Sequence, residues 1–177
     1  MNFNVDLNCI DESFVRIAEE LMNEHLIKVK NELYRIVECE FYFSNKQYNH
    51  DDPYTHGHNE QIKNGSWYFH GSGIDITIGN KDNDSRGGIL IRGLAKISNK
   101  QNANGDYLEV SDKTIGPLKV LTTLFSHFSD VFDSTNFFYL IHNAQVVNAN
   151  LTHASIFRLP RIGLNIAKDA NSFYNKA

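Results

Sequence analysis

Apolar residues recur every three or four positions near the start of the chain. This spacing places them on one side of a helix and predicts an amphipathic helix over residues 10–30. Its apolar side is formed by Phe14, Ile17, Ala18, Leu21, Met22 and Leu26. Asp11 or Ser13 is suited to cap the first turn. The simplest role for such a helix is to cover a hydrophobic core.

The pattern then changes to one typical of strands. Residues 33–43 are rich in aromatic and β-branched side chains, which favour a strand. Further strands are predicted over residues 66–70, 74–78 and 87–98. The segment Gly71-Ser72-Gly73 permits a tight turn between the first two of these. The middle of the chain is therefore expected to be rich in β-structure.

Other segments carry weaker signals. Three polar segments are predicted as loops or turns, at residues 44–65, 79–86 and 99–114. The first exceeds the usual length of a connection, which points to a functional role. Pro117 precedes a predicted helix over residues 118–128, because proline is favoured in the first helical turn. Residues 137–147 are apolar and fit either a strand or a helix.

Composition limits the class of protein. The chain has 177 residues, of which 41% are hydrophobic and 12% aromatic, so it is expected to form one domain with a real core. No apolar run approaches the ~20 residues that span a bilayer, and the N-terminus lacks a signal-peptide pattern. Only Cys9 and Cys39 are present, which excludes a disulfide framework. We therefore expect a cytoplasmic protein with no membrane partner.

The formal net charge of −4 conceals an asymmetry. Residues 1–85 contain 7 Lys and Arg against 15 Asp and Glu, whereas residues 86–177 contain 10 against 6. The basic second half is compatible with an anionic partner such as a nucleic-acid backbone, but charge alone favours ordinary scatter of surface charge.

Two carboxylates in an apolar strand are the first candidate for chemistry. Glu38 and Glu40 are two residues apart, so they share one face of the predicted strand. Charged groups are costly to desolvate, so this face needs either water or a partner. Arg92, in another apolar strand, is a suitable partner for either glutamate. The set is explained either by a structural ion pair on a solvated face or by a cleft in which one carboxylate acts as a general base.

A loop rich in histidine is the second candidate. His50, His56, His58, Asp51 and Asp52 all have side chains that bind metals. Their spacing matches no zinc pattern, so we expect neither a metal nor another cofactor. A metal-dependent hydrolase that uses the three histidines remains the less favoured alternative.

Six short motifs in one order resemble the alkyladenine (3-methyladenine) DNA glycosylase family. They are Arg35-Ile36-Val37-Glu38-Cys39-Glu40-Phe41-Tyr42, Asp52-Pro53-Tyr54-Thr55-His56, a strand pair from Trp67 to Asn80, Ile89-Leu90-Ile91-Arg92, Gly116-Pro117-Leu118-Lys119 and Arg161-Ile162-Gly163. The resemblance implies an α+β fold, with a curved antiparallel sheet flanked by helices in a single compact domain over residues 1–177. The motif-bearing core is expected at about residues 33–165, after the helix at about 10–30.

The resemblance also implies an activity. That family hydrolyses the N-glycosidic bond of damaged bases in DNA without a metal, in base-excision repair, after flipping the base out of the helix. Glu40 matches its general base, Arg92 matches the arginine that holds the water and the base, and Glu38 supports them. The residues expected to line the base pocket are Tyr42, His56, His70 and Asn80.

One difference from that family bears on the substrate. Family members insert a tyrosine into the minor groove, and Ser72-Gly73 occupies that place here, so no bulky wedge is present. We expect DNA as the partner, and the missing wedge extends this expectation to single-stranded or modified DNA. We expect the protein to bind it as a monomer. A second hypothesis is a non-catalytic module of the same fold that binds a nucleobase or nucleic acid.

Overall fold

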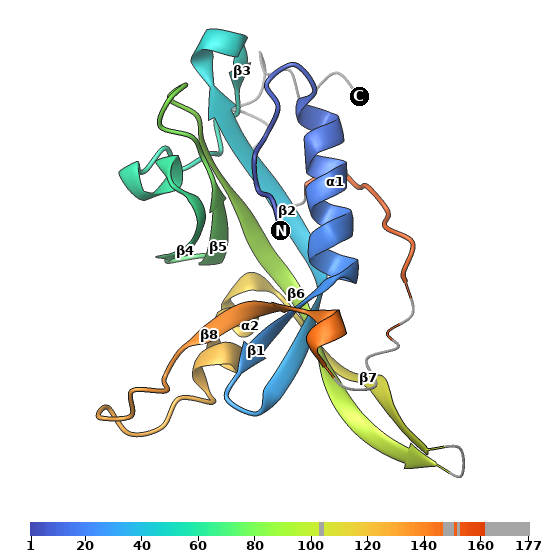
Figure 1. Cartoon of the computed structure of the whole chain (residues 1–177). Helices are drawn as coiled ribbons and strands as arrows, with labels where there is room; N and C mark the ends of the chain where they lie inside the picture. The colour runs from blue at the N-terminus through green and yellow to red at the C-terminus, as the bar shows by residue number, and fades with distance from the viewer. Residues whose placement is uncertain (103–104, 147–150, 152, 162–177) are drawn as a thin grey trace.

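The computed structural model describes residues 1–102, 105–146, 151 and 153–161 (Figure 1). Its helices are α1 (Ile10–Asn23) and α2 (Pro117–Phe125), with 3₁₀ turns η1 (Lys46–Tyr48), η2 (Asn59–Ile62) and η3 (Asn143–Gln145). Its strands are β1 (His25–Val29), β2 (Glu32–Asn45), β3 (His50–Asp51), β4 (Asn64–His70), β5 (Gly73–Ile78), β6 (Arg86–Asn102), β7 (Gly105–Ile115) and β8 (Phe138–His142).

All strands of the described residues join one antiparallel sheet. The order is β4-β5-β6-β2-β1-β8, with β3 added to β2 and β7 added to β6. The sheet curves so strongly that Trp67 on β4 meets Phe138 on β8, with ring centroids 5.1 Å apart. The predicted class, a compact α+β domain built on a curved antiparallel sheet with flanking helices, is therefore confirmed (Figure 1).

The two faces of the sheet differ in chemistry because side chains alternate along each strand. Phe41 on β2 lies opposite Ile89 on β6, and both face the core. Helix α1 covers this face, where its Phe14 ring stacks on Phe41 with centroids 4.6 Å apart. Glu40, the residue before Phe41, pairs with Leu90 and so faces the other way. The functional candidates on β2 and β6 therefore lie on the face opposite α1.

The first helix is shorter than the pattern predicts. It ends at Asn23, and residues 25–29 form β1, which pairs with β2 on one side and β8 on the other. Leu26, expected on the helix, is a buried strand residue. Its helical spacing is coincidental, because pairing with two neighbouring strands satisfies this segment's backbone better than another helical turn. The strand predicted over residues 33–43 is confirmed and extends by a few residues at the C-terminal end.

The polar segment at residues 99–114 is not a loop. β6 continues to Asn102 and pairs with β7 over most of its length, forming an arm that projects from the domain (Figure 1). Backbone hydrogen bonds are sufficient to build such an arm, so it needs few apolar side chains and the hydrophobic pattern misses it. The segment at residues 44–65, predicted as a loop, contains the end of β2, η1, β3, η2 and the start of β4, and is irregular mainly over residues 52–58.

Two predictions concern the elements after β7, at residues 118–128 and 137–147. The helix expected over residues 118–128 is confirmed as α2, which ends at Phe125. The ambiguous segment at residues 137–147 contains strand β8. Within the described part of the chain, no helix is long and apolar enough to cross a membrane.

Helix α2 supplies a test of the core. Its Leu124 is fully buried, whereas Leu118 on the same helix is 54% exposed. Leu124→Ala should lower the free energy of unfolding by about 2–5 kcal/mol, because it leaves a cavity in the core. The matched change Leu118→Ala should alter it by no more than about 0.5 kcal/mol. Urea denaturation measures both, and equal losses would show that α2 does not pack as described.

Candidate functional site

Three charged side chains meet on the sheet face opposite α1. Arg92 Nε donates to Glu38 Oε1 at 3.1 Å, and Arg92 Nη1 donates to Glu40 Oε1 at 2.9 Å. The two glutamates lie on β2, and Arg92 lies on the adjacent strand β6. The expectation that Arg92 pairs with a carboxylate of this strand is confirmed, and both glutamates take part.

The cluster carries more negative than positive charge, because two carboxylates share one guanidinium. Burial lowers the pKa of Arg92, but the Glu40 and Glu38 carboxylates outweigh this effect and raise it above its usual value. Arg92 therefore stays charged. The Glu40 side chain is 10% exposed and that of Glu38 is 38% exposed, so Glu40 is the better enclosed carboxylate. An enclosed negative charge is suited to stabilising positive charge that develops on a bound ligand.

Tyr42 completes the hydrogen bonding of Glu40. Its hydroxyl donates to Glu40 Oε2 at 2.6 Å, so each oxygen of this carboxylate has one protein donor. Burial raises the pKa of Tyr42 far above its usual value, and the hydrogen bond to Glu40 raises it further. The hydroxyl thus keeps its proton and holds the carboxylate. Each carboxylate oxygen retains a second lone pair that is able to accept from water.

Arg161 covers Tyr42 from a distant part of the chain. Its guanidinium carbon lies 4.6 Å from the centre of the Tyr42 ring, in cation–π contact. The same guanidinium binds Asp52 with two hydrogen bonds, at 2.6 and 3.0 Å. Asp52 is almost completely buried, so this bidentate pair is shielded from solvent. One ring face of Tyr42 is therefore already occupied by a side chain of the protein.

Residues 153–161 form the strap that carries Arg161. Near its start, Ala154 N donates to Asn23 Oδ1 at 2.9 Å, and Asn23 Nδ2 donates to Ala154 O at 3.2 Å. The strap is thus tied to the end of α1 and then reaches Asp52. Sequence reasoning placed Arg161 in a motif but gave it no place in the site. It missed the ion pair of Asp52 with Arg161, because the two residues are 109 positions apart in the sequence.

A buried carboxylate lies on the same face, two strands away from Glu40. Asp75 on β5 is opposite Leu90, which is itself opposite Glu40. Asp75 Oδ1 pairs with His70 Nε2 at 3.0 Å, and Gln61 Nε2 lies 3.5 Å from Asp75 Oδ2. Asp75 lies within the strand predicted over residues 74–78, where it alternates with isoleucines, but the sequence analysis gives it no place in the site. The sequence hinted at a role for Asp75 only by placing one carboxylate between isoleucines in that strand.

A group of rings joins His70 to the histidine loop. The ring centroids of Tyr68 and His70 are 5.4 Å apart and stacked, and His58 stacks on Tyr68 at the same distance. His56 meets His70 edge to face at 4.7 Å and is exposed. The structure therefore brings His56 and His70 together on the Asp75 side of the face, whereas Tyr42 lies on the Glu40 side.

Asn80 does not join either group. Its backbone pairs with Ser85, and its side-chain oxygen accepts from Asp82 N at 2.8 Å. The residue is exposed and closes the turn that follows β5. An asparagine after a strand commonly makes such a local bond, and this use keeps Asn80 away from the expected base pocket.

The loop histidines do not converge. The His50 ring lies 5.8 Å from Phe43, beside the core, whereas His56 and His58 lie beside Tyr68. In the described residues no group of three or more His, Cys, Asp or Glu side chains is arranged to hold a metal ion. The geometry thus gives no support to a metal-dependent hydrolase that uses these three histidines.

Cys39, between the two glutamates, is not arranged as a nucleophile. It faces the core with Phe41, and burial together with the Glu38 and Glu40 charges raises the pKa of its thiol to about 12. A thiol of this kind stays protonated at neutral pH and reacts poorly. Chemistry at this place on β2 falls to the carboxylates.

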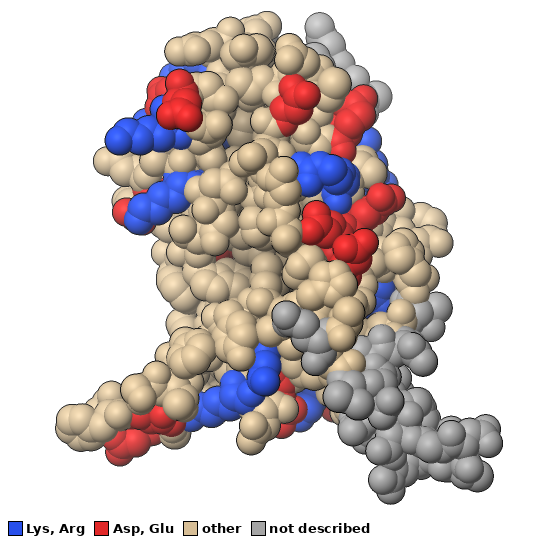
Figure 2. Space-filling view, viewed as in Figure 1, with Lys and Arg blue, Asp and Glu red and all other residues tan. Residues whose placement is uncertain are grey.

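Charges of both signs are interspersed on the face of the molecule shown in Figure 2. Lys and Arg side chains there alternate with Asp and Glu rather than forming a continuous basic track. The basic second half of the sequence therefore does not produce a strongly positive surface on this face. A polyanion bound there would have few phosphates in contact with basic side chains.

Comparison with known proteins adds one relative. Uncharacterized protein L759 of Acanthamoeba polyphaga mimivirus is 29% identical to the chain over 189 aligned positions, which cover 90% of this chain and 81% of that protein. No protein-family model matches the chain, and no solved structure is significantly similar to it. The similarity spans most of both chains, and the name of the viral protein states no activity. Functional argument therefore depends on the geometry of the site.

Gly88 offers a direct test of how the Asp75 side of the site is built. A Cβ at Gly88 would lie 2.4 Å from Asp75 Oδ2, whereas a Cβ at Gly71 would meet nothing within 4 Å. Gly88→Ala should displace Asp75 and lower the free energy of unfolding by ~1–3 kcal/mol, as overpacking does. Gly71→Ala should leave it unchanged or raise it by up to about 1 kcal/mol. Urea denaturation at neutral pH distinguishes them, and an unaffected Gly88→Ala protein would contradict the placement of Asp75.

Proposed function

We propose that this protein is a cytoplasmic, metal-independent N-glycosylase that hydrolyses the bond between a damaged or modified base and deoxyribose in DNA. The observation that carries the proposal is the cluster on β2 and β6, in which Arg92 and Tyr42 hold a mostly enclosed Glu40 carboxylate. The resemblance of the motif order to the alkyladenine DNA glycosylases supports the same conclusion, because Glu40 and Arg92 match the residues that act on water in that family.

The proposed reaction uses Glu40 twice. As the bond from sugar C1′ to the base nitrogen breaks, its electron pair leaves with the base and positive charge develops on the sugar. The negative surplus of Glu38, Glu40 and Arg92 stabilises that charge. The oxygen of a water molecule then bonds to C1′, and the proton of this water passes to the Glu40 carboxylate.

The remaining residues are assigned supporting roles. Arg92 and Tyr42 fix the orientation of the Glu40 carboxylate through their hydrogen bonds. A base that has been flipped out of the nucleic acid is proposed to reach the exposed His56, which meets His70 edge to face. Stacking on aromatic or imidazole rings contributes ~1–3 kcal/mol per base.

Single-stranded or distorted DNA is the substrate we favour. The turn at Gly71 and Ser72 is exposed and offers no bulky side chain to fill the gap that a flipped base leaves in a duplex. Unstacking costs least when the base is damaged or already unpaired, so such DNA does not require a wedge. We propose that the protein acts on it as a monomer.

The test is single-turnover release of a base from oligonucleotides that carry alkylated, deaminated or oxidised purines, in single and double strands. Glu40→Gln keeps the size of the side chain but cannot take the proton from water, so release should slow by ~10²–10⁴-fold. Glu38→Gln should have a smaller effect. Glu32→Gln is the matched control, because Glu32 lies on the same strand and pairs with Lys96 away from the cluster at 2.9 Å.

Circular dichroism of each variant checks that it folds. Equal rates for Glu40→Gln and the unchanged protein would end the catalytic assignment. If the unchanged protein releases no base from any oligonucleotide yet binds some of them, the non-catalytic base-binding module takes its place.

A further inference from the structure

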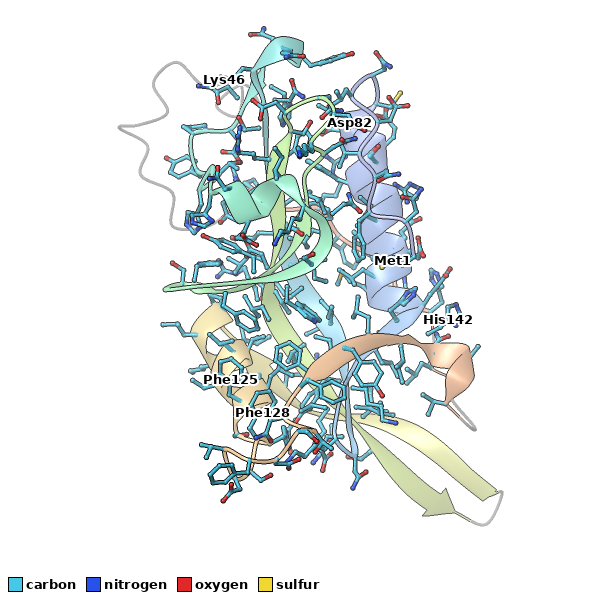
Figure 3. All side chains as sticks on the ribbon, turned by 60° about the vertical axis from the view of Figure 1, so that its left-hand side comes forward. Met1, Lys46, Asp82, Phe125, Phe128 and His142 are labelled. Atoms are coloured by element: carbon cyan, nitrogen blue, oxygen red, sulfur yellow. The ribbon has the colours of Figure 1, made fainter. Side chains whose placement is uncertain are left out.

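A cavity lies at the end of the sheet where η1 and the turn after β5 come together. Figure 3 shows this end, with Lys46 on η1 and Asp82 on the turn. The cavity has a volume of about 330 Å³. Its walls come from the end of β2, from the loop that follows β3, and from the turn before β6. This volume falls in the lower part of the range for small-ligand sites.

Two side chains of the cavity wall hold polar atoms without partners. Thr55 Oγ1 and Arg86 Nε are both buried, and neither makes a hydrogen bond to any of the described residues. Solvent does not reach these atoms, so an unpaired group of this kind costs roughly 1–3 kcal/mol. Native structures rarely leave two such atoms in one cavity wall without a functional reason.

Hydrogen bonds of Asn45 hold another part of the wall in place. Asn45 is buried, and its side-chain nitrogen donates to Asn83 O at 2.9 Å and to Ser85 Oγ at 2.8 Å. Its side-chain oxygen accepts from Tyr48 N at 3.1 Å. These bonds fix the end of β2 against the turn before β6.

The charges of the wall argue for a neutral ligand. Arg161 neutralises Asp52 and Arg86 Nη1 pairs with Asp84 at 2.9 Å, which leaves Lys46 and Asp51 to balance each other. An anion would meet three carboxylates here, and a cation would meet two basic groups. A neutral planar group with an acceptor for Arg86 Nε and a polar neighbour for the Thr55 hydroxyl suits the wall best.

We infer that this cavity is a binding subsite for an unpaired nucleobase next to the one that is excised. The inference rests on the proposed function, because Asp52 lines the cavity and also holds Arg161, which lies over Tyr42 of the catalytic cluster. A nucleobase presents donor and acceptor atoms side by side on one planar edge and carries no charge. Thr55 and Arg86 both line the cavity, and their side chains must rotate to present Oγ1 and Nε to that edge, because both atoms are buried in the ligand-free protein.

If the Thr55 hydroxyl serves the subsite, its removal should have opposite effects on the stability of the protein and on its affinity for a base. Thr55→Val keeps the shape of the side chain and removes the unpaired hydroxyl. The ligand-free variant should therefore unfold at the same or a higher urea concentration than the unchanged protein. Its affinity for a base should fall about fivefold, which corresponds to one lost hydrogen bond. A residue with a purely structural role would not show this combination.

The experiment titrates the isotopically labelled full chain with adenosine, guanosine, cytidine and uridine at up to ~10 mM, and follows backbone amides by NMR. At least one nucleoside should shift the amides of residues 44–57 and 83–86. Thr55→Val and Arg86→Lys, which keeps the charge opposite Asp84 but removes Nε, should each weaken that binding about fivefold. Thr114→Val on β7 is the matched control and should change nothing.

Ribose and inorganic phosphate are titrated separately. Shifts caused equally by ribose or phosphate, or no shifts at these amides with any nucleoside, would overturn the subsite. Equal affinity of Thr55→Val and the unchanged protein would do the same. The titration does not require catalysis and is repeated on Glu40→Gln. A failure of base release with nucleoside binding intact therefore counts against the glycosylase alone, and the reverse result counts against the subsite alone.

Discussion

The ion pair of Arg92 with Glu38 and Glu40 constrains the sheet around it. Two carboxylates on one face of a strand are tolerated beside an apolar core only if a cation lies against them. Alternation along β2 places Phe41 in the core and the glutamates on the opposite face, and pairing with β6 brings Arg92 to them. The pairing is irregular on both sides of Glu38, where Val37 on β2 and Arg92 on β6 have no partner residue, so the cluster lies at this irregularity. A one-residue slip of the regular segments on either side would turn charge toward the core.

Those parts of the site that follow from alternation could be predicted from the sequence. Glu38, Glu40 and Arg92 stand out because they interrupt apolar strands, and a strand's period of two places both glutamates on one face. The contact of Arg161 with Asp52 could not be derived in this way, since the two residues are separated by more than a hundred positions and no local pattern links them. Burial of Asp75 was equally hidden, because alternation does not tell whether η2 covers the polar face.

The fold shows the same division between local and distant information. The helices and central strands follow from hydrophobic periodicity, and α2 is where the pattern puts it. The end of α1 and the β6–β7 arm were predicted wrongly because backbone pairing decides them. Leu26 fits a helix by spacing but lies in a strand that is paired on both sides. The arm pairs with little apolar patterning, and a reading based on hydrophobicity sees mostly polar residues there.

In this account the two halves of the polar face have different tasks. Glu40, Arg92 and Tyr42 form an enclosed and negatively charged centre on β2 and β6. His70, Asp75 and the rings beside them form a polar wall on β4 and β5. Arg161 lies over Tyr42 in the first half, and its partner Asp52 also lines the cavity at the end of the sheet. In this arrangement a damaged base would meet the rings beside His70, and its sugar would meet the Glu40 cluster. A neighbouring base would occupy the cavity lined by Asp52.

The claim that the carboxylate cluster stabilises a positively charged sugar is tested most directly with two abasic-site analogues in the same oligonucleotide. One carries a pyrrolidine ring, whose protonated nitrogen mimics the charge of the transition state, and the other carries a neutral tetrahydrofuran ring. Equilibrium binding to the unchanged protein should favour the pyrrolidine by at least about tenfold, and Glu40→Gln should remove most of that preference. Equal affinity of the unchanged protein for the two oligonucleotides would contradict the account.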